Sequence, residues 1–129
     1  MILVDSSVWI DYFNGVGNEQ TDTLNGTLGI MPIAIGDLIL TEVLQGFRAD
    51  KDYVIAKSLF EELVIFDLVG KDMAIKSAEN FRTLRKRGIT IRKPVDVIIA
   101  SFCIERKLPL LFTDRDFIPF VKNLGLISA

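Results

Sequence analysis

Short apolar runs alternate along the chain with longer stretches in which apolar residues recur every three to four positions. Strands are predicted at the short runs 2–4, 32–35, 64–68 and 108–112, and a last edge strand is expected at 126–128. Helices are predicted at the amphipathic stretches 8–13, 19–28, 38–47, 52–63, 71–87, 94–105 and 117–124. Strands separated by helices in this way indicate a layered α/β fold with a mostly parallel central sheet.

The composition is typical of a folded globular domain. The 129 residues are 50% hydrophobic and 25% charged, and neither a repeat nor a linker divides them, so we expect a single domain over 1–129. No segment has the length of a membrane span, and the first residues lack the features of a signal peptide. The lone Cys103 lies in an apolar run and is expected to be a small buried hydrophobe. These features favour a cytoplasmic protein without a membrane partner.

The chain contains no histidine, and this excludes several kinds of chemistry. Ser-His and Cys-His nucleophile pairs and imidazole metal sites are all ruled out. A single cysteine also rules out a thiolate zinc cluster. Any chemistry must therefore use carboxylates, hydroxyls, amides and cations, which points to a hard metal ion with oxygen ligands.

Four acids stand out by their positions. Asp5 closes the first predicted strand and Asp114 follows the strand at 108–112, so a parallel sheet would bring both to the same edge. Glu42 and Asp96 lie on predicted helices among apolar neighbours, where a lone charge is costly. Each has a simpler interpretation, Glu42 as an exposed helix residue and Asp96 as an acid favoured by the helix dipole. Together the four would carry a charge of −4, which two Mg²⁺ or Mn²⁺ ions would cancel, and a cation-acidified water would hydrolyse phosphate esters without histidine.

Three further polar residues lie beside these acids. Ser6 and Thr113 are predicted to orient a carboxylate or a metal-bound water, with helix capping as the alternative, and for Ser6 capping is the favoured interpretation. Asp116 is either a further metal ligand or the N-cap of the last helix, and it ranks below the other four acids. The aromatic residues Trp9, Tyr12 and Phe13 are expected to pack in the core rather than stack on bases.

One stretch of the chain is strongly basic, although the net charge of the whole is −2. Between 82 and 93 there are six cations and no acid, immediately before Asp96. The residues predicted to contact an RNA backbone are Arg85, Lys86, Arg87, Arg92 and Lys93. A solvated helix end or a docking surface for an acidic protein partner would have the same charge pattern.

Four segments around these acids resemble the motifs of PIN-domain ribonucleases of the VapC toxin type. They are ILVDSSVWID at 2–11, TEVLQG at 41–46, PVDVIIA at 94–100 and LFTDRDF at 111–117. The resemblance covers nearly the whole chain and implies a PIN-like three-layer domain. It also implies that Asp5, Glu42, Asp96 and Asp114 coordinate metal, with Asp116 beside them.

The function implied by the resemblance is that of a Mg²⁺- or Mn²⁺-dependent endoribonuclease that cuts a structured RNA such as a tRNA or ribosomal RNA. Members of this family are usually homodimers and are held inactive by a cognate antitoxin. A catalytically silent PIN-like module that binds RNA or protein is the main alternative, and it predicts the loss of one or more acids. A phosphatase or phosphorelay receiver is disfavoured because position 7 is Ser rather than Asp. DNA stays open as a substrate, since only contacts to the 2′-hydroxyl distinguish it from RNA.

Overall fold

The computed structural model describes residues 1–129 and contains a four-stranded sheet in the order β3-β2-β1-β4. The strands are β1 (Ile2–Val4), β2 (Ile33–Gly36), β3 (Val64–Phe66) and β4 (Leu110–Leu111). Every pairing is parallel: β1 pairs with β2 at Ile2 and Ile33, and with β4 at Leu3 and Leu110. The predicted strand at 126–128 is wrong, because only one bridge, Leu110 to Ser128, forms there.

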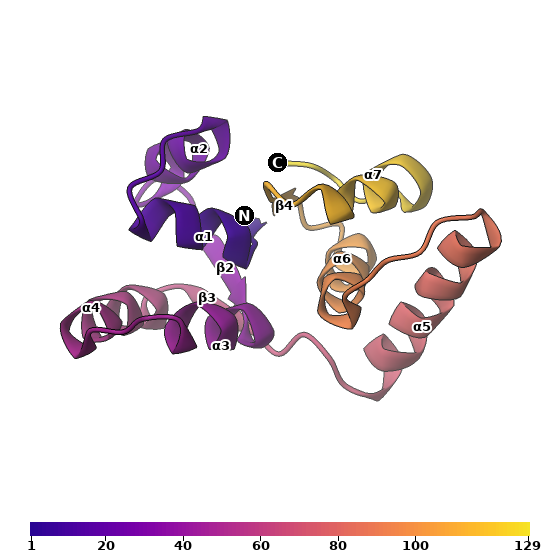
Figure 1. The fold of residues 1–129 in the computed structure, drawn as a ribbon, viewed down its shortest axis with the longest axis horizontal. Helices are drawn as coiled ribbons and strands as arrows, with labels where there is room; N and C mark the ends of the chain where they lie inside the picture. The colour runs from indigo at the N-terminus through magenta and orange to yellow at the C-terminus, as the bar shows by residue number, and fades with distance from the viewer.

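Helices lie on both sides of this short sheet (Figure 1). Their bounds are α1 (Ser6–Phe13), α2 (Glu19–Thr27), α3 (Asp37–Gln45), α4 (Asp50–Glu61), α5 (Lys71–Lys86), α6 (Pro94–Arg106) and α7 (Ile118–Leu124), with a 3₁₀ turn η1 (Arg115–Phe117) before α7. All seven predicted helices are therefore confirmed, with ends shifted by a few residues. The layered α/β fold is also confirmed.

Helix α6 begins and α5 ends where the sequence provides the appropriate residues. Pro94 occupies the first turn of α6, where its missing N–H costs no hydrogen bond. Gly88 follows α5 with φ +82°, a conformation that glycine adopts without strain. Together these residues set the loop that brings the chain from α5 to the first turn of α6.

A single apolar core of 27 buried residues joins the sheet to the helices. Trp9 is fully buried, and its ring centroid lies 4.9 Å from that of Phe60 and 6.0 Å from that of Phe13. The prediction that Trp9 and Phe13 pack in the core is confirmed, as is the burial of Cys103. No helix of the structure is both long and apolar enough to cross a membrane.

The parallel pairing of β1 with β4 positions the candidate site. Leu3 N donates to Pro109 O and Asp5 N donates to Leu111 O, each at 2.9 Å, so the carboxyl ends of the two strands lie side by side. The residues that follow these two strands must therefore face each other across the same edge of the sheet.

Candidate active site

Asp5 lies at the carboxyl end of β1 and is only 3% exposed. Its Oδ2 accepts hydrogen bonds from Ser7 N at 3.1 Å and from Ser7 Oγ at 2.6 Å. Asp5 therefore caps α1, and the expectation that Ser6 is the cap is wrong, because the helix already begins at Ser6. Burial raises the pKa of the Asp5 carboxyl, while the bonds from Ser7 oppose the rise and the nearby Asp114 charge adds to it.

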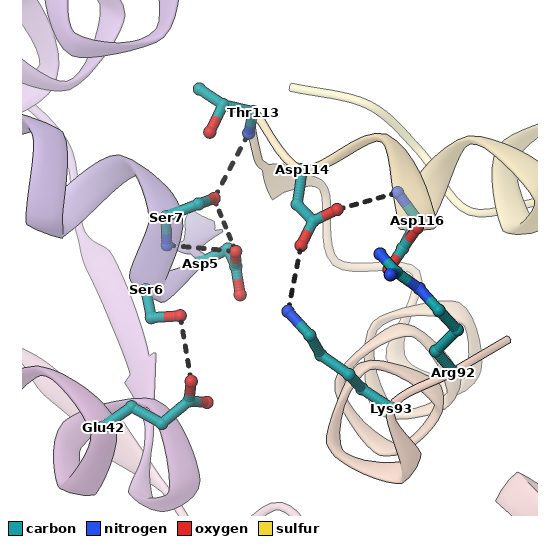
Figure 2. Close-up of polar contacts among 9 residues, drawn as sticks. All are labelled: Asp5, Ser6, Ser7, Glu42, Arg92, Lys93, Thr113, Asp114 and Asp116. Carbon is teal, nitrogen blue, oxygen red and sulfur yellow. Dashed lines mark hydrogen bonds and ion pairs between the residues drawn. The ribbon is translucent and has the colours of Figure 1, made fainter.

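Ser7 links the two adjacent strand ends (Figure 2). Thr113 N, just beyond β4, donates to Ser7 Oγ at 3.4 Å, while the same hydroxyl donates to Asp5. Thr113 thus takes part through its backbone rather than through the hydroxyl that sequence reasoning singled out. Ser7 itself was missed as a site residue. The available signal was its position two residues after an acid that ends a strand and caps a helix, where both its N–H and its hydroxyl reach the carboxylate.

Asp96 lies in the first turn of α6 and is 7% exposed. Its Oδ2 is buried and has no hydrogen-bond partner. Burial, followed by the charges of Asp5 and Asp114, raises the pKa of this carboxyl to about 7. A buried carboxylate oxygen without a donor is costly for the protein alone, and it is available to a cation.

Asp114 and Asp116 approach Asp96 from the turn η1. One carboxylate oxygen from each of the three residues lies within 4.8 Å of the other two. Asp114 Oδ1 accepts from Asp116 N at 2.9 Å, so Asp114 caps η1, and the alternative in which Asp116 caps the last helix is wrong. Asp116, ranked last among the acids from sequence, is thus one of the three that lie closest together.

Glu42 lies on α3, apart from these three acids. The residue is exposed, as its simpler interpretation from sequence predicted, whereas its neighbours Ile39 and Val43 are buried in the core. Its carboxyl group nevertheless turns toward α1, where Ser6 Oγ donates to Glu42 Oε2 at 3.4 Å (Figure 2). Partial burial, followed by the charge of Asp5, raises the pKa of Glu42.

The cations of the basic stretch 82–93 have different neighbours in the folded chain. Lys93 Nζ lies 3.7 Å from Asp114 Oδ2, and Arg92 lies 3.5 Å from Asp116 Oδ2. These two cations are exposed and pair with Asp116 and Asp114 rather than with Asp96, which follows them in the sequence.

The other cations of this stretch do not reach the acids. Arg87 donates to the side chain and carbonyl of Asn123. Arg85 lies over the ring of Phe81, and Lys86 is exposed on α5. These three cations therefore lie outside the group of acids, and their contact with RNA stays a prediction.

Four segments distant in sequence thus bring five acids to one edge of the sheet. We call Asp5, Glu42, Asp96, Asp114 and Asp116 the acid cluster. The donor set consists of carboxylate oxygens, which are the ligands that Mg²⁺ and Mn²⁺ prefer. The raised pKa values of Asp5, Glu42 and Asp96 show that the folded protein holds these charges at a cost. Divalent cations would remove that cost, and Asp96 Oδ2 offers an oxygen that no protein donor uses.

Comparison with known proteins finds relatives over nearly the whole chain. A family model described as PIN domain matches residues 2–121. VapC ribonuclease Mb1587 of Mycobacterium bovis is 27% identical over 131 residues, which cover 100% of this chain and 98% of that protein. Ribonuclease VapC1 of Methanocaldococcus jannaschii is 29% identical over 125 residues, which cover 97% of this chain and 84% of that protein.

Solved structures share the fold. VapBC2 from Rickettsia felis, bound to a DNA fragment from the promoter, matches with a TM-score of 0.76 and 21% identity over 100% of this chain and 98% of that one. VapC20 of Mycobacterium tuberculosis, described as a toxin that cleaves the sarcin-ricin loop, matches with a TM-score of 0.70 and 16% identity over 100% and 98% of the two chains.

Proposed function

Because the chain belongs to the PIN domain family, we propose that it is a toxin-type endoribonuclease that hydrolyses RNA phosphodiester bonds and is neutralised by a cognate antitoxin. The observation that carries the proposal is the convergence of five acids: Asp96, Asp114 and Asp116 lie together, and the charge of Asp5 acts on both Asp96 and Glu42. The full-length relatives named as VapC ribonucleases support it, and so does the fold shared with proteins from toxin–antitoxin complexes.

The cofactor we propose is Mg²⁺, with Mn²⁺ able to substitute. Its ligands would come from Asp5, Glu42, Asp96, Asp114 and Asp116, all of which offer oxygen atoms. A cation at such a site supplies an acidified water and neutralises charge on the phosphate under attack. The unpartnered Asp96 Oδ2 and the close approach of three carboxylates support this choice.

The protein residues prepare the site by holding these oxygens in place. Ser7 fixes one oxygen of Asp5 with two hydrogen bonds and leaves the other free of them. Ser6 holds Glu42 toward the cluster, and Asp116 N fixes one oxygen of Asp114. Such fixed orientation lowers the cost of assembling the site before substrate binds.

Arg92 and Lys93 are the cations best placed to contact the phosphates of the substrate. Both side chains are largely exposed, and both lie within ion-pair distance of the acids. With Asp114 and Asp116 holding a metal ion, Arg92 and Lys93 would be free to pair with an RNA backbone. Arg85, Lys86 and Arg87 would act further along the strand. We also propose that the protein acts in the cytoplasm as a homodimer on a structured RNA such as a tRNA or ribosomal RNA.

The experiment that tests this function is cleavage of total cellular RNA by purified protein in Mg²⁺ or Mn²⁺ and in EDTA. Asp5→Ala and Asp96→Asn remove acids from the cluster, and Asp52→Asn removes an exposed acid on α4 as the matched control. We expect discrete fragments from the unsubstituted chain and from Asp52→Asn in metal, and none in EDTA or from the two site variants.

Two outcomes would contradict the proposal. Cleavage that survives EDTA or Asp96→Asn would exclude the acid cluster as the active site. An absence of cleavage by folded protein that binds metal would favour the catalytically silent module, although such a module would be expected to lack some of the acids. The same assay with single-stranded DNA of matched sequence shows whether the substrate is RNA or DNA.

A further inference from the structure

Helices α5 and α6 pack along each other and leave an apolar groove with a volume of about 440 Å³. Its walls are formed on one side by α5 and on the other by α6, chiefly by Ala74, Ala78, Phe81, Pro94, Val97 and Ile98. None of these residues belongs to the acid cluster. A concave site of this size with mostly apolar walls is typical of a ligand pocket.

The groove also contains a polar group without a partner. Ser77 lines it and is 5% exposed, yet its hydroxyl makes no hydrogen bond within the protein. An unpaired buried hydroxyl is unfavourable, and a purely apolar occupant would leave it unpaired. This residue therefore favours an occupant that has both an apolar face and a polar edge.

The rim of the groove is cationic. Arg82 and Arg85, both exposed on α5, line it, and the guanidinium of Arg85 lies 5.5 Å from the centre of the Phe81 ring. No acid occurs between 82 and 93 to neutralise this rim. An occupant attached to negative charge would be attracted here.

The first turn of α6 connects the groove to the acid cluster. Pro94 and Val97 face the groove, while Asp96, between them in sequence, belongs to the cluster. The two places therefore lie on opposite sides of one helix, whose diameter with side chains is about 10 Å. Arg92 and Lys93, just before this helix, reach toward the acids (Figure 2), and α5 lies next to α6 (Figure 1).

We propose, resting on the function proposed above, that the α5–α6 groove binds one unpaired nucleobase of the RNA substrate while the phosphodiester to be cut lies at the acids. Unstacked bases bind between apolar or aromatic side chains and arginine planes, with polar groups at their edges. The apolar walls receive the faces of the base and Ser77 pairs with its edge. Arg82 and Arg85 contact the neighbouring phosphates. The groove would thus give the nuclease a preference for one base near the cut, on the far side of α6 from the acids.

The test is binding of short fluorescent single-stranded RNAs, one each of U, A, C and G, and of an abasic ribose-phosphate strand of the same length. Anisotropy is measured with Ca²⁺ in place of Mg²⁺, and a gel confirms that the RNA stays intact. Ala78→Met fills the groove, and Ser58→Met, at an exposed position of α4, is its matched control. Ser77→Ala removes only the hydroxyl. Arg85→Gln is compared with Lys51→Gln, which changes an exposed cation on α4, outside the groove and the basic stretch.

We expect the full-length protein to prefer one base and to bind it more tightly than the abasic strand. Ala78→Met should weaken binding of that RNA about tenfold, as loss of one base contact does, and leave the abasic strand within about twofold. Ser77→Ala should reduce the preference among bases, and Arg85→Gln should weaken binding of all strands more than Lys51→Gln does.

Four results would overturn the proposal. Equal binding of base-containing and abasic RNA, or no response to Ala78→Met, removes the base site and leaves the nuclease function intact. A change in oligomeric state caused by Ala78→Met, measured by light scattering, assigns the groove to contact between copies of the chain. If folded protein binds none of the RNAs, the nuclease function fails together with the base site.

Discussion

Ser7 donates two hydrogen bonds to one carboxylate oxygen of Asp5, from its backbone nitrogen at 3.1 Å and from its hydroxyl at 2.6 Å. The same hydroxyl accepts from Thr113 N at 3.4 Å, so Ser7 also joins the ends of β1 and β4. The orientation of a buried acid and the alignment of two strand ends therefore depend on one small side chain.

Ser7→Ala should lower the rate of RNA cleavage by roughly tenfold while the protein stays folded. The substitution removes the hydroxyl bond but keeps the backbone bond, and a hydrogen bond to a charged group contributes about 1.5–3 kcal/mol. The checks are the cleavage rate, the midpoint of a Mn²⁺ titration and a circular dichroism spectrum. Ser7→Thr, which keeps a hydroxyl, should retain much of the activity. If Ser7→Ala and Ser58→Ala cleave equally fast, the hydroxyl does not orient Asp5.

Mg²⁺ or Mn²⁺ should raise the melting temperature of the protein, and Asp96→Asn should abolish most of that rise. A ligand that binds only the folded state stabilises it by about 2.7 kcal/mol at one hundred times its dissociation constant. In EDTA, Asp96→Asn should be at least as stable as the unsubstituted chain, because it removes a buried charge that its neighbours disfavour. Thermal denaturation with and without metal measures both effects. A melting temperature that saturating metal leaves unchanged would argue against the cluster as a metal site.

The sequence was sufficient to predict the order of helices and strands and the meeting of Asp5 with Asp114. Those predictions rest on apolar periodicity and on the rule that parallel strands end at one edge, and both are properties of the backbone pattern. The positions of Asp96 and Asp5 follow from the same rules, because one opens a helix after Pro94 and the other ends a strand.

The sequence did not predict which side chains pair across the site, because those contacts depend on how distant segments meet in the folded chain. Arg92 and Lys93 stand four and three residues before Asp96 in the sequence, yet they pair with Asp116 and Asp114, which come near them only in the folded chain. The exposure of Glu42 depends on which face of α3 meets the core, and its apolar neighbours in sequence hide this. The short last strand at 126–128 is reduced to one bridge because β4 has only two residues.

Metal-free protein should lose stability as the pH rises from about 4 to 7. The folded pKa of Asp96 is about 7, whereas an unfolded Asp has a pKa of about 3.9. Between these values the folded state holds a proton that the unfolded state has lost, so stability falls with rising pH and levels off above 7. Asp5 and Glu42 shift in the same direction.

Melting temperatures in EDTA across this range, for the unsubstituted chain and for Asp96→Asn, measure the effect. The dependence should be weaker in Asp96→Asn, and saturating Mg²⁺ should remove it because cations replace the protons. A melting temperature that rises between pH 5 and 7 in EDTA would contradict the raised pKa of Asp96.

Lys93→Gln should weaken RNA binding and reduce its salt dependence while leaving stability nearly unchanged. In the ion pair of Lys93 with Asp114, the Lys93 side chain is 60% exposed and the Asp114 side chain 29%. Exposed ion pairs of this kind contribute little to the free energy of folding. Each phosphate contact that is lost lowers the slope of log affinity against log salt by about 0.7 for a single strand. Anisotropy titrations at several salt concentrations measure that slope, and Lys51→Gln, an exposed cation on α4, is the control. If Lys93→Gln and Lys51→Gln give the same slope as the unsubstituted chain, Lys93 does not contact the backbone and serves only to neutralise Asp114.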